Sequence, residues 1–241
     1  MPDIIRLDEV DSTNSYLKAR SGELPDGTVV TARLQTAGRG RRGHVWEADE
    51  SMLPLSILLV NPPDIESLTA RVGLAVCEAL EEVCGDALQA RIKWANDVIV
   101  DSRKVCGILC ENTLIGDCAN VVVGIGVNVS QSAEFFADAE LLHAASLLTL
   151  TGNAPEREAV LRATVSCVKK RAAMPFSECL GEYRARLLNL GREVKLISAG
   201  GERVAIAVDV SEVGHLICRD ENGLFEVHSG EVSVRGLDGY L

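Results

Sequence analysis

The chain has 241 residues, of which 47% are hydrophobic and 24% charged, as is typical of a soluble globular protein with a sizeable core. Its 24 Lys and Arg against 35 Asp and Glu give a net charge of −11, which argues against general binding to DNA or to anionic membranes. No apolar run reaches the roughly 18–20 residues that cross a bilayer, and the first residues do not form a secretory signal.

The eight cysteines are scattered through apolar segments and form no CxxC pair. Because the chain also has only four histidines, its sequence argues against a zinc site. Cysteines in such surroundings are typical of small, reduced core residues. We therefore expect a cytoplasmic protein.

Strand and helix signals alternate in the first third of the chain. Alternating or continuous apolar stretches predict strands at residues 4–7, 28–33 and 53–60, the last of them buried on both faces. A row of polar capping residues at 11–14 predicts a helix over residues 15–20. Apolar residues that recur every three or four positions over 65–83 predict an amphipathic helix that ends at Gly85.

The middle of the chain predicts consecutive strands. They cover residues 91–100, with a turn or kink at Asn96 and Asp97, and then residues 104–111 and 120–129, which should pair antiparallel. Glycines at 107, 124 and 126 weaken these strands unless something must lie close against the sheet. We expect that something to be a ligand.

The last third begins with helical patterns over residues 144–150, 155–174 and 176–188. Beyond Gly191 the pattern changes to short alternating runs separated by glycine-rich turns, which predict a small β-barrel. We therefore expect a domain boundary near Asn189, with one domain over residues 1–189 and a second over 190–241.

The loop of residues 38–43 has the sequence GRGRRG and is strongly basic, whereas the chain as a whole is acidic. Its three glycines allow a ligand to approach the backbone closely. Its three arginines offer forks of N–H donors that match carboxylate or phosphate oxygens. A cationic, flexible loop of this kind suits a polyphosphate or an acyl phosphate.

Five motifs follow one another along the chain: DSTN (11–14), QTAGRGRRG (35–43), KWxND (93–97), KxxGILxE (104–111) and GIGVN (124–128). In this order and spacing they resemble the biotin–protein ligases, and with the C-terminal segment the resemblance covers essentially the whole chain. It implies an α+β fold, in which a mixed β-sheet flanked by helices is followed by a small SH3-like β-barrel. The mixed sheet would be biotin/lipoate ligase-like and related to class II aminoacyl-tRNA synthetase catalytic domains.

The resemblance also implies a reaction. The family activates biotin with ATP to biotinoyl-5′-AMP and then transfers biotin to a lysine of a biotin carboxyl carrier domain, here of acetyl-CoA carboxylase or a related carboxylase. ATP, Mg²⁺ and biotin are therefore expected, without a tightly bound prosthetic group. No nucleic acid or membrane partner is expected, and a homodimer stays open.

Residue roles follow from the matched motifs. Lys104 and Arg41 are the expected catalytic residues, and Asp97 is the candidate metal ligand. The expected biotin contacts are Ser12, Thr13, Asn14, Gln35, Gly38, Arg39, Gly40, Arg41, Arg42, Lys104, Gly107 and Gly124. The expected ATP contacts are Arg41, Arg42, Trp46, Asn96, Lys104 and Asn128.

The chain departs from the family pattern at two positions: His44 stands where an arginine is common, and Ala95 replaces a proline. Because the first motif begins at residue 11, no room is left for an N-terminal helix-turn-helix, so the chain resembles the monofunctional branch. Two alternatives stay open: a lipoate–protein ligase, and a non-catalytic biotin- or nucleotide-binding sensor. The arginine loop and the C-terminal segment favour biotin, and Lys104 together with that loop favours catalysis.

Overall fold

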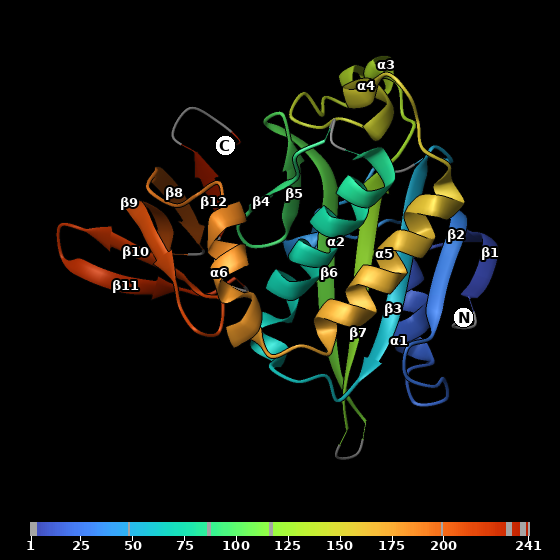
Figure 1. Cartoon of the computed structure of the whole chain (residues 1–241), viewed down its shortest axis with the longest axis horizontal. Coiled ribbons are helices and arrows are strands. Elements are labelled where there is room, and N and C mark those ends of the chain that lie inside the picture. The colour runs from blue at the N-terminus through green and yellow to red at the C-terminus, as the bar shows by residue number, and fades with distance from the viewer. Residues whose placement is uncertain are drawn as a thin grey trace.

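The computed structural model describes residues 4–47, 49–85, 88–115, 118–198, 200–229, 233–236 and 240. Its larger sheet has seven strands (Figure 1). In spatial order these are β1 (Ile4–Val10), β2 (Val29–Gln35), β3 (Met52–Val60), β7 (Cys118–Asn128), β6 (Arg103–Ile115), β5 (Asp97–Val100) and β4 (Arg91–Lys93). β1 pairs parallel with β2 and the other pairs are antiparallel, which confirms the predicted mixed sheet.

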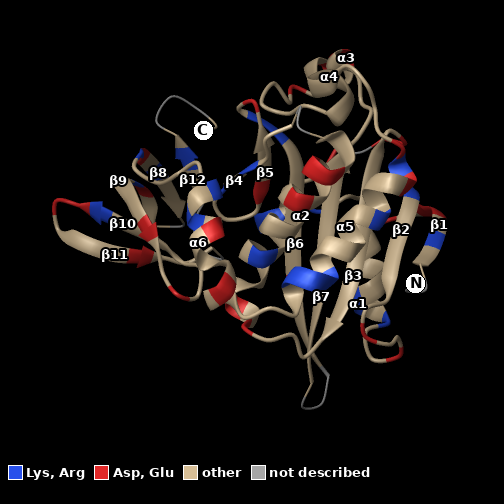
Figure 2. Cartoon of the chain, viewed as in Figure 1, with Lys and Arg blue, Asp and Glu red and all other residues tan. Residues whose placement is uncertain are grey.

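The centre of this sheet is apolar on both faces. β3 is buried along nearly its whole length, as predicted, and neither β3 nor its neighbour β7 carries a charged residue (Figure 2). Successive side chains of a strand point to opposite faces. Hence Leu58 and Val122 pack with Leu17 of α1 (Thr13–Ala19) on one face, while Ile57 and Val123 join the main core on the other.

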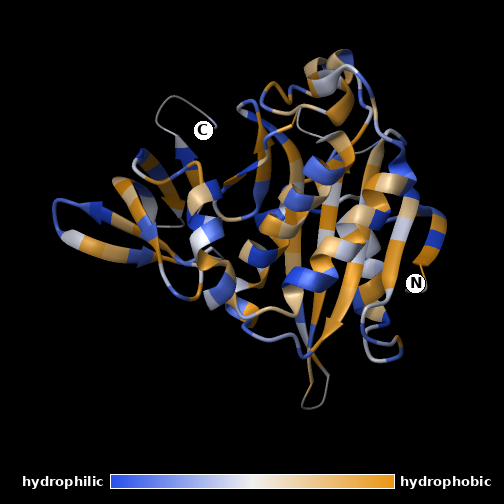
Figure 3. Ribbon diagram, viewed as in Figure 1, coloured by the Kyte–Doolittle hydropathy of each residue, from blue (hydrophilic) through white to orange (hydrophobic). Residues whose placement is uncertain are grey.

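The main core lies between the sheet and two long helices, α2 (Leu68–Cys84) and α5 (Arg157–Ala172), which run side by side across it (Figure 1). Their inward stripes are hydrophobic (Figure 3). A 3₁₀ turn, η2 (Ile65–Ser67), precedes α2, and Gly85 at φ 71° ends it, so the helix predicted over residues 65–83 is confirmed. The shorter helices are α3 (Ala133–Asp138), which the sequence did not predict, and α4 (Leu147–Thr151).

A second, smaller sheet follows α6 (Phe176–Arg186). Its strands are β8 (Glu193–Ser198), β9 (Gly201–Val210), β10 (Leu216–Asp220), β11 (Gly223–Val227) and β12 (Ser233–Gly236), paired antiparallel in the order β11-β10-β9-β8-β12. The sequence predicts a small β-barrel in this region, and its described strands form a small antiparallel sheet. Its buried residues belong to the same hydrophobic cluster as the main core.

Two hydrogen bonds of Trp94 join the sheets. The Trp94 backbone N–H donates to Asn189 Oδ1 at 2.7 Å, and its indole N–H donates to the Gly214 carbonyl at 3.0 Å. Asn189 is only 6% exposed, so this junction is part of the interior. The division of the chain at residue 189 stays a prediction.

All eight cysteines are free, and five of them are buried. Burial raises the pKa of the Cys77 thiol to about 12, which keeps it protonated and inert. Within the described ranges, no helix is both long and apolar enough to cross a membrane.

Candidate active site

The five motifs come together around one cavity of about 360 Å³ beside the larger sheet. Among the described residues that line it, six are cationic: Arg39, Arg41, Arg42, Lys93, Lys104 and Arg235. The described lining includes only two carboxylates, Asp97 and Glu140. In a chain of net charge −11, this excess of positive charge indicates a site for an anionic ligand.

One end of the cavity is a buried network of neutral polar groups. Thr13 donates from its backbone N–H and its hydroxyl to Gln35 Oε1, at 2.8 and 3.0 Å. The Ser56 hydroxyl lies 2.8 Å from Thr13 Oγ1 and 2.6 Å from Asn14 Oδ1. These groups suit a neutral ligand that carries both donors and acceptors. Sequence reasoning missed Ser56, because it is a single hydroxyl inside the apolar strand β3.

Ser12 also lines the cavity, but it has a structural task as well. It is the N-cap of α1, and its hydroxyl accepts from the Ser15 N–H at 3.4 Å. The cap fixes the start of the helix and thereby aims Thr13 and Asn14 at the cavity.

Glu111 stabilises the neutral polar end of the cavity. Its carboxylate accepts from Asn14 Nδ2 at 3.0 Å and forms ion pairs with Lys18 and Arg39, both at 3.2 Å. Burial raises the pKa of Glu111, but these partners outweigh it and lower the pKa below its ordinary value. The charged carboxylate therefore holds α1, β6 and the arginine loop together.

The arginine loop folds back on itself. Gly40 N–H donates to the His44 carbonyl at 2.8 Å and Trp46 N–H to the Gly38 carbonyl at 3.0 Å, on either side of a bridge between Arg39 and Val45. A Cβ at Gly38 would overlap the Trp46 carbonyl, so glycine is required there. Gly38 shapes the loop and is not among the lining residues, in contrast to its predicted biotin contact.

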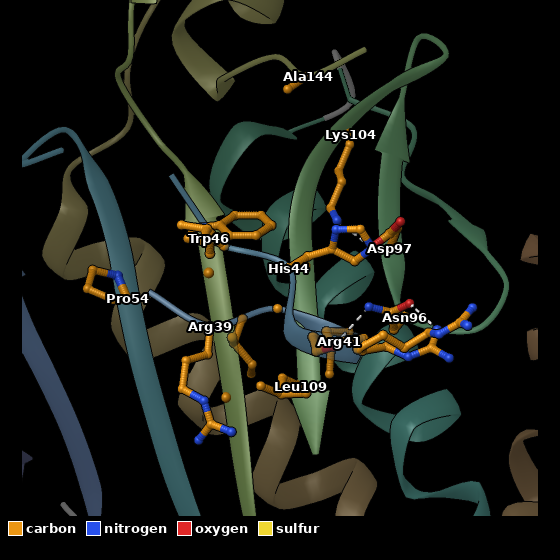
Figure 4. A pocket seen from close by; sticks show the side chains of 18 of the residues that line it. Arg39, Arg41, His44, Trp46, Pro54, Asn96, Asp97, Lys104, Leu109 and Ala144 are labelled. Atoms are coloured by element: carbon orange, nitrogen blue, oxygen red, sulfur yellow. Dashed lines mark hydrogen bonds and ion pairs between the residues drawn. The ribbon is translucent and has the colours of Figure 1, made fainter. Parts of the chain in front are cut away.

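Three strand glycines form the floor of the cavity, yet what lies against them is protein. A Cβ at Gly107 or Gly126 would come within 2.5 or 2.8 Å of the Trp46 ring, and a Cβ at Gly124 would overlap the Asn14 side chain. The glycines therefore admit Trp46 and Asn14, which line the cavity together with them, and the predicted contacts of Gly107 and Gly124 with a ligand stay predictions. Figure 4 shows the Trp46 ring lying across the strands.

The other end of the cavity contains a cluster of charges around Asp97. Lys104 Nζ lies 2.6 Å from Asp97 Oδ1, and the Tyr240 hydroxyl donates to Asp97 Oδ2 at 2.5 Å (Figure 4 shows the lysine and the carboxylate). Burial raises the pKa of Asp97, but Lys104 and its other partners outweigh burial and hold the pKa below its ordinary value. The carboxylate is therefore charged and keeps Lys104 aimed into the cavity.

Lys93 is one of two cavity cations, with Arg235, to which sequence reasoning gave no role. It is 5% exposed, and its ammonium lies 3.6 Å from the centre of the Tyr240 ring. Burial lowers its pKa to about 8, because the attraction of Asp97 only partly offsets it and neighbouring cations lower the pKa further. Lys93 is the first residue of the KWxND motif, but only the fold shows that its side chain is buried and lines the cavity.

Two further predicted contacts make hydrogen bonds inside the protein. Arg41 Nη1 donates to Asn96 Oδ1 at 2.8 Å, which ties the arginine loop to the β4–β5 turn (Figure 4). Arg42 Nη1 donates to the Ile197 carbonyl at 3.0 Å, which ties the same loop to the smaller sheet. The loop thus spans both parts of the chain at the mouth of the cavity.

Asn128 does not line the cavity. It is 4% exposed, donates to the Ala145 carbonyl at 3.1 Å and accepts from Gln131 Nε2 at 3.2 Å. Its side chain holds the segment that follows β7, so its predicted adenine contact has no direct geometric support in this conformation.

The described residues offer no ready-made magnesium site. Mg²⁺ is commonly held by one or two carboxylates together with substrate phosphates. Here Asp97 is bound by Lys104 and Tyr240, and the positive charges of Lys104, Lys93 and Arg41 act on it. A metal ion would have to displace Lys104 to reach this carboxylate.

Comparison with known proteins agrees with this geometry. The sequence model of the Biotin/lipoate A/B protein ligase family matches residues 7–128, which carry all five motifs. A model of the Biotin protein ligase C terminal domain matches residues 190–235, which contain the smaller sheet. The chain belongs to the biotin/lipoate A/B protein ligase family.

Individual relatives and one solved structure, all named as biotin ligases, are similar to this chain over most of its length. A biotin–[acetyl-CoA-carboxylase] ligase of Mycobacterium tuberculosis is 34% identical over 89% of this chain and 82% of its own length. One of Paracoccus denitrificans is 30% identical over 95% of this chain and 100% of its own. The solved structure of a biotin protein ligase from Aquifex aeolicus in complex with biotin and ATP superposes with a TM-score of 0.84 and 36% identity, covering 98% of this chain and 100% of that one.

Proposed function

We propose that this chain is a biotin–protein ligase. It activates biotin with ATP to biotinoyl-AMP and transfers the biotinoyl group to a lysine of a biotin carboxyl carrier domain. The observation that carries this proposal is that one cavity has both a neutral polar end at Thr13, Asn14 and Gln35 and a cationic end at Lys93 and Lys104. A neutral ring system that bears a carboxylate, next to a triphosphate, matches both ends.

The chemistry proceeds in two steps. The biotin carboxylate attacks the α-phosphorus of ATP, a new P–O bond forms, and pyrophosphate leaves. The amine of the carrier lysine then attacks the carbonyl of the mixed anhydride, and AMP leaves while the amine loses a proton. We assign Lys104 to the oxygens whose charge changes in the first step, since it extends from β6 into the cavity and is 23% exposed.

In this proposal Mg²⁺ binds together with ATP and neutralises the charge of its phosphates. The assignment of Asp97 as its ligand stays a prediction, while the contacts of Asp97 support a second role, in which it positions Lys104 and holds the Tyr240 hydroxyl. A cytoplasmic location fits eight free cysteines. The absence of a nucleic acid partner and the oligomeric state stay predictions.

Mass spectrometry of a biotin carboxyl carrier domain, incubated with this chain, biotin and Mg-ATP, tests the function. One added biotinoyl group on one lysine is expected, and none when ATP is omitted. Lipoate in place of biotin tests the lipoate–protein ligase alternative, and modification only with lipoate would overturn the proposal. Binding of biotin without any modified carrier or adenylate would favour the sensor instead.

The affinity for ATP should depend on pH through Lys93. Phosphate oxygens favour the protonated lysine, so affinity is full below pH 8 and falls as pH rises through about 8, by at most about tenfold per unit. Titration calorimetry between pH 7 and 9.5 measures this dependence. Lys93→Arg keeps its charge across that range and should flatten the curve. Equal slopes in both proteins would show that another group titrates.

Arg41→Gly should release the adenylate early. A hydrogen bond from a charged group contributes about 1.5–3 kcal/mol, so retention of biotinoyl-AMP should fall about tenfold to a hundredfold. The measurement is biotin attached to an unrelated lysine-rich protein, with adenylate synthesis followed in parallel. Arg42→Gly is a comparison within the same loop, because Arg42 has a φ of 55° that suits glycine and its Nη1 donates to the Ile197 carbonyl rather than to Asn96. Bystander labelling that is unchanged in Arg41→Gly, or equal in both variants, would argue against this role.

A further inference from the structure

The smaller sheet brings together three metal-binding side chains far from the motifs. His215, Glu226 and His228 each offer a ligand atom, and these atoms all lie within 4.8 Å of one another. The pair register explains why they meet. Leu216 pairs with Val227 across β10 and β11, so His215 and His228 face each other one position beyond the ladder. Glu226 precedes His228 by two residues and therefore points to the same face.

The geometry of this cluster is close to that of a coordination sphere. His215 Nδ1 lies 3.1 Å from Glu226 Oε2, and the two imidazole rings are 4.1 Å apart between centroids. Ligand atoms of a tetrahedral zinc ion, with bonds of about 2.0–2.1 Å, lie about 3.3 Å apart. The pair of His215 and Glu226 already has about this separation, and the other ligand atoms, all within 4.8 Å, would move closer by side-chain rotation when an ion binds.

The backbone of the cluster is held firmly, as a binding site requires. His215 N–H donates to Ser211 Oγ at 3.2 Å, and the His215 carbonyl accepts from Ser211 N–H at 2.9 Å. Its neighbour Gly214 accepts the indole hydrogen bond of Trp94. The histidine thus stands on a fixed turn at the junction of the two sheets.

The sequence argues against a zinc site, but the fold brings together ligands that no sequence motif connects, and we propose that His215, Glu226 and His228 bind a divalent transition-metal ion of the zinc type. Two imidazoles and one carboxylate suit zinc and its neighbours, whereas Ca²⁺ and Mg²⁺ prefer oxygen ligands alone. Three protein ligands leave a position for water. The ion clips β10 to β11 at the end that contacts the larger sheet, and so stabilises the smaller sheet.

Zinc titration into the full chain tests the proposal by calorimetry, and thermal unfolding follows the same samples. We expect one ion per chain and a rise in melting temperature with Zn²⁺. His228→Gln should weaken binding at least tenfold and abolish the thermal shift. His44→Gln removes an exposed histidine elsewhere and should leave both unchanged.

Binding to a thiol is the main competing outcome, since the chain has an exposed Cys118. Co²⁺ as a substitute probe distinguishes the two, because thiolate ligands add an intense charge-transfer band that nitrogen and oxygen ligands lack. Absence of zinc binding, binding that survives His228→Gln, or binding lost in Cys118→Ser would each overturn the site. None of these measurements depends on ligase activity.

Discussion

Replacing Lys104 with alanine should lower the rate of biotinoyl-AMP formation about a hundredfold to a thousandfold, the usual loss when one electrostatic donor to a reacting centre is removed. Lys104 is expected to act on charge that develops during the first step. The ion pair with Asp97 holds the Lys104 ammonium in place, so the ammonium is already oriented toward the cavity before the reaction begins. Pyrophosphate exchange that depends on biotin measures this step directly, without a carrier domain.

Lys170→Ala is the matched control for this experiment. Lys170 also forms an ion pair with a carboxylate, at 2.6 Å from Glu78, but it lies on α5 away from the residues that line the cavity and its side chain is 61% exposed. It should retain nearly full activity. Because Lys104→Ala leaves Asp97 with fewer partners, thermal unfolding should be recorded alongside. A folded Lys104→Ala protein that makes adenylate at the wild-type rate would exclude the assigned role.

Arg71→Leu should lower the free energy of unfolding by about 3–5 kcal/mol, among the largest effects expected of a single substitution. Arg71 lies on α2 with no exposed surface. Its guanidinium donates to the carbonyls of Ala172 at 2.6 Å, Met174 and Asp64 at 2.9 Å, and Pro63. Leucine fills much of the volume but leaves these buried carbonyls without donors.

Urea denaturation of Arg71→Leu against wild type measures this loss. Arg162→Leu on α5 is a suitable comparison, because Arg162 forms an exposed ion pair with Glu158 one helical turn away. Such pairs contribute about 0.3–0.5 kcal/mol. A loss in Arg71→Leu as small as that would show that water satisfies the carbonyls in its place.

Most elements of the fold are readable from sequence because their signals are local. The apolar run of β3 and the repeat of α2 lie within single segments, and their ends carry their own signals, as with Gly85. α3 is different. It is six residues long and has one buried side chain, Phe136, so no apolar repeat can develop. The strand order is likewise not local, because β7 inserts between β3 and β6.

In the candidate site, too, some features can be predicted from local sequence and others cannot. Motifs indicate which residues face the cavity, and Thr13, Gln35, Arg41 and Lys104 all do. They do not indicate what a residue contacts. Asn128 and Gly38 serve the protein's own structure, and the partners that hold the site in shape come from distant segments: Ser56 from β3, Tyr240 from the last described position. Only three-dimensional placement identifies these.

The contact between Trp46 and the two strand glycines limits how this protein can change over generations. Alanine at Gly107 or Gly126 would collide with the indole, since its Cβ would lie 2.5 or 2.8 Å from the ring. A smaller side chain at position 46 would leave a gap over both glycines and remove the bond to Met52 Sδ at 3.3 Å. No single substitution at these positions keeps the packing intact. Position 46 lies 61 residues before position 107 and 80 before position 126, yet the three positions should vary together in descent, with a smaller side chain at position 46 accompanying any larger one at 107 or 126.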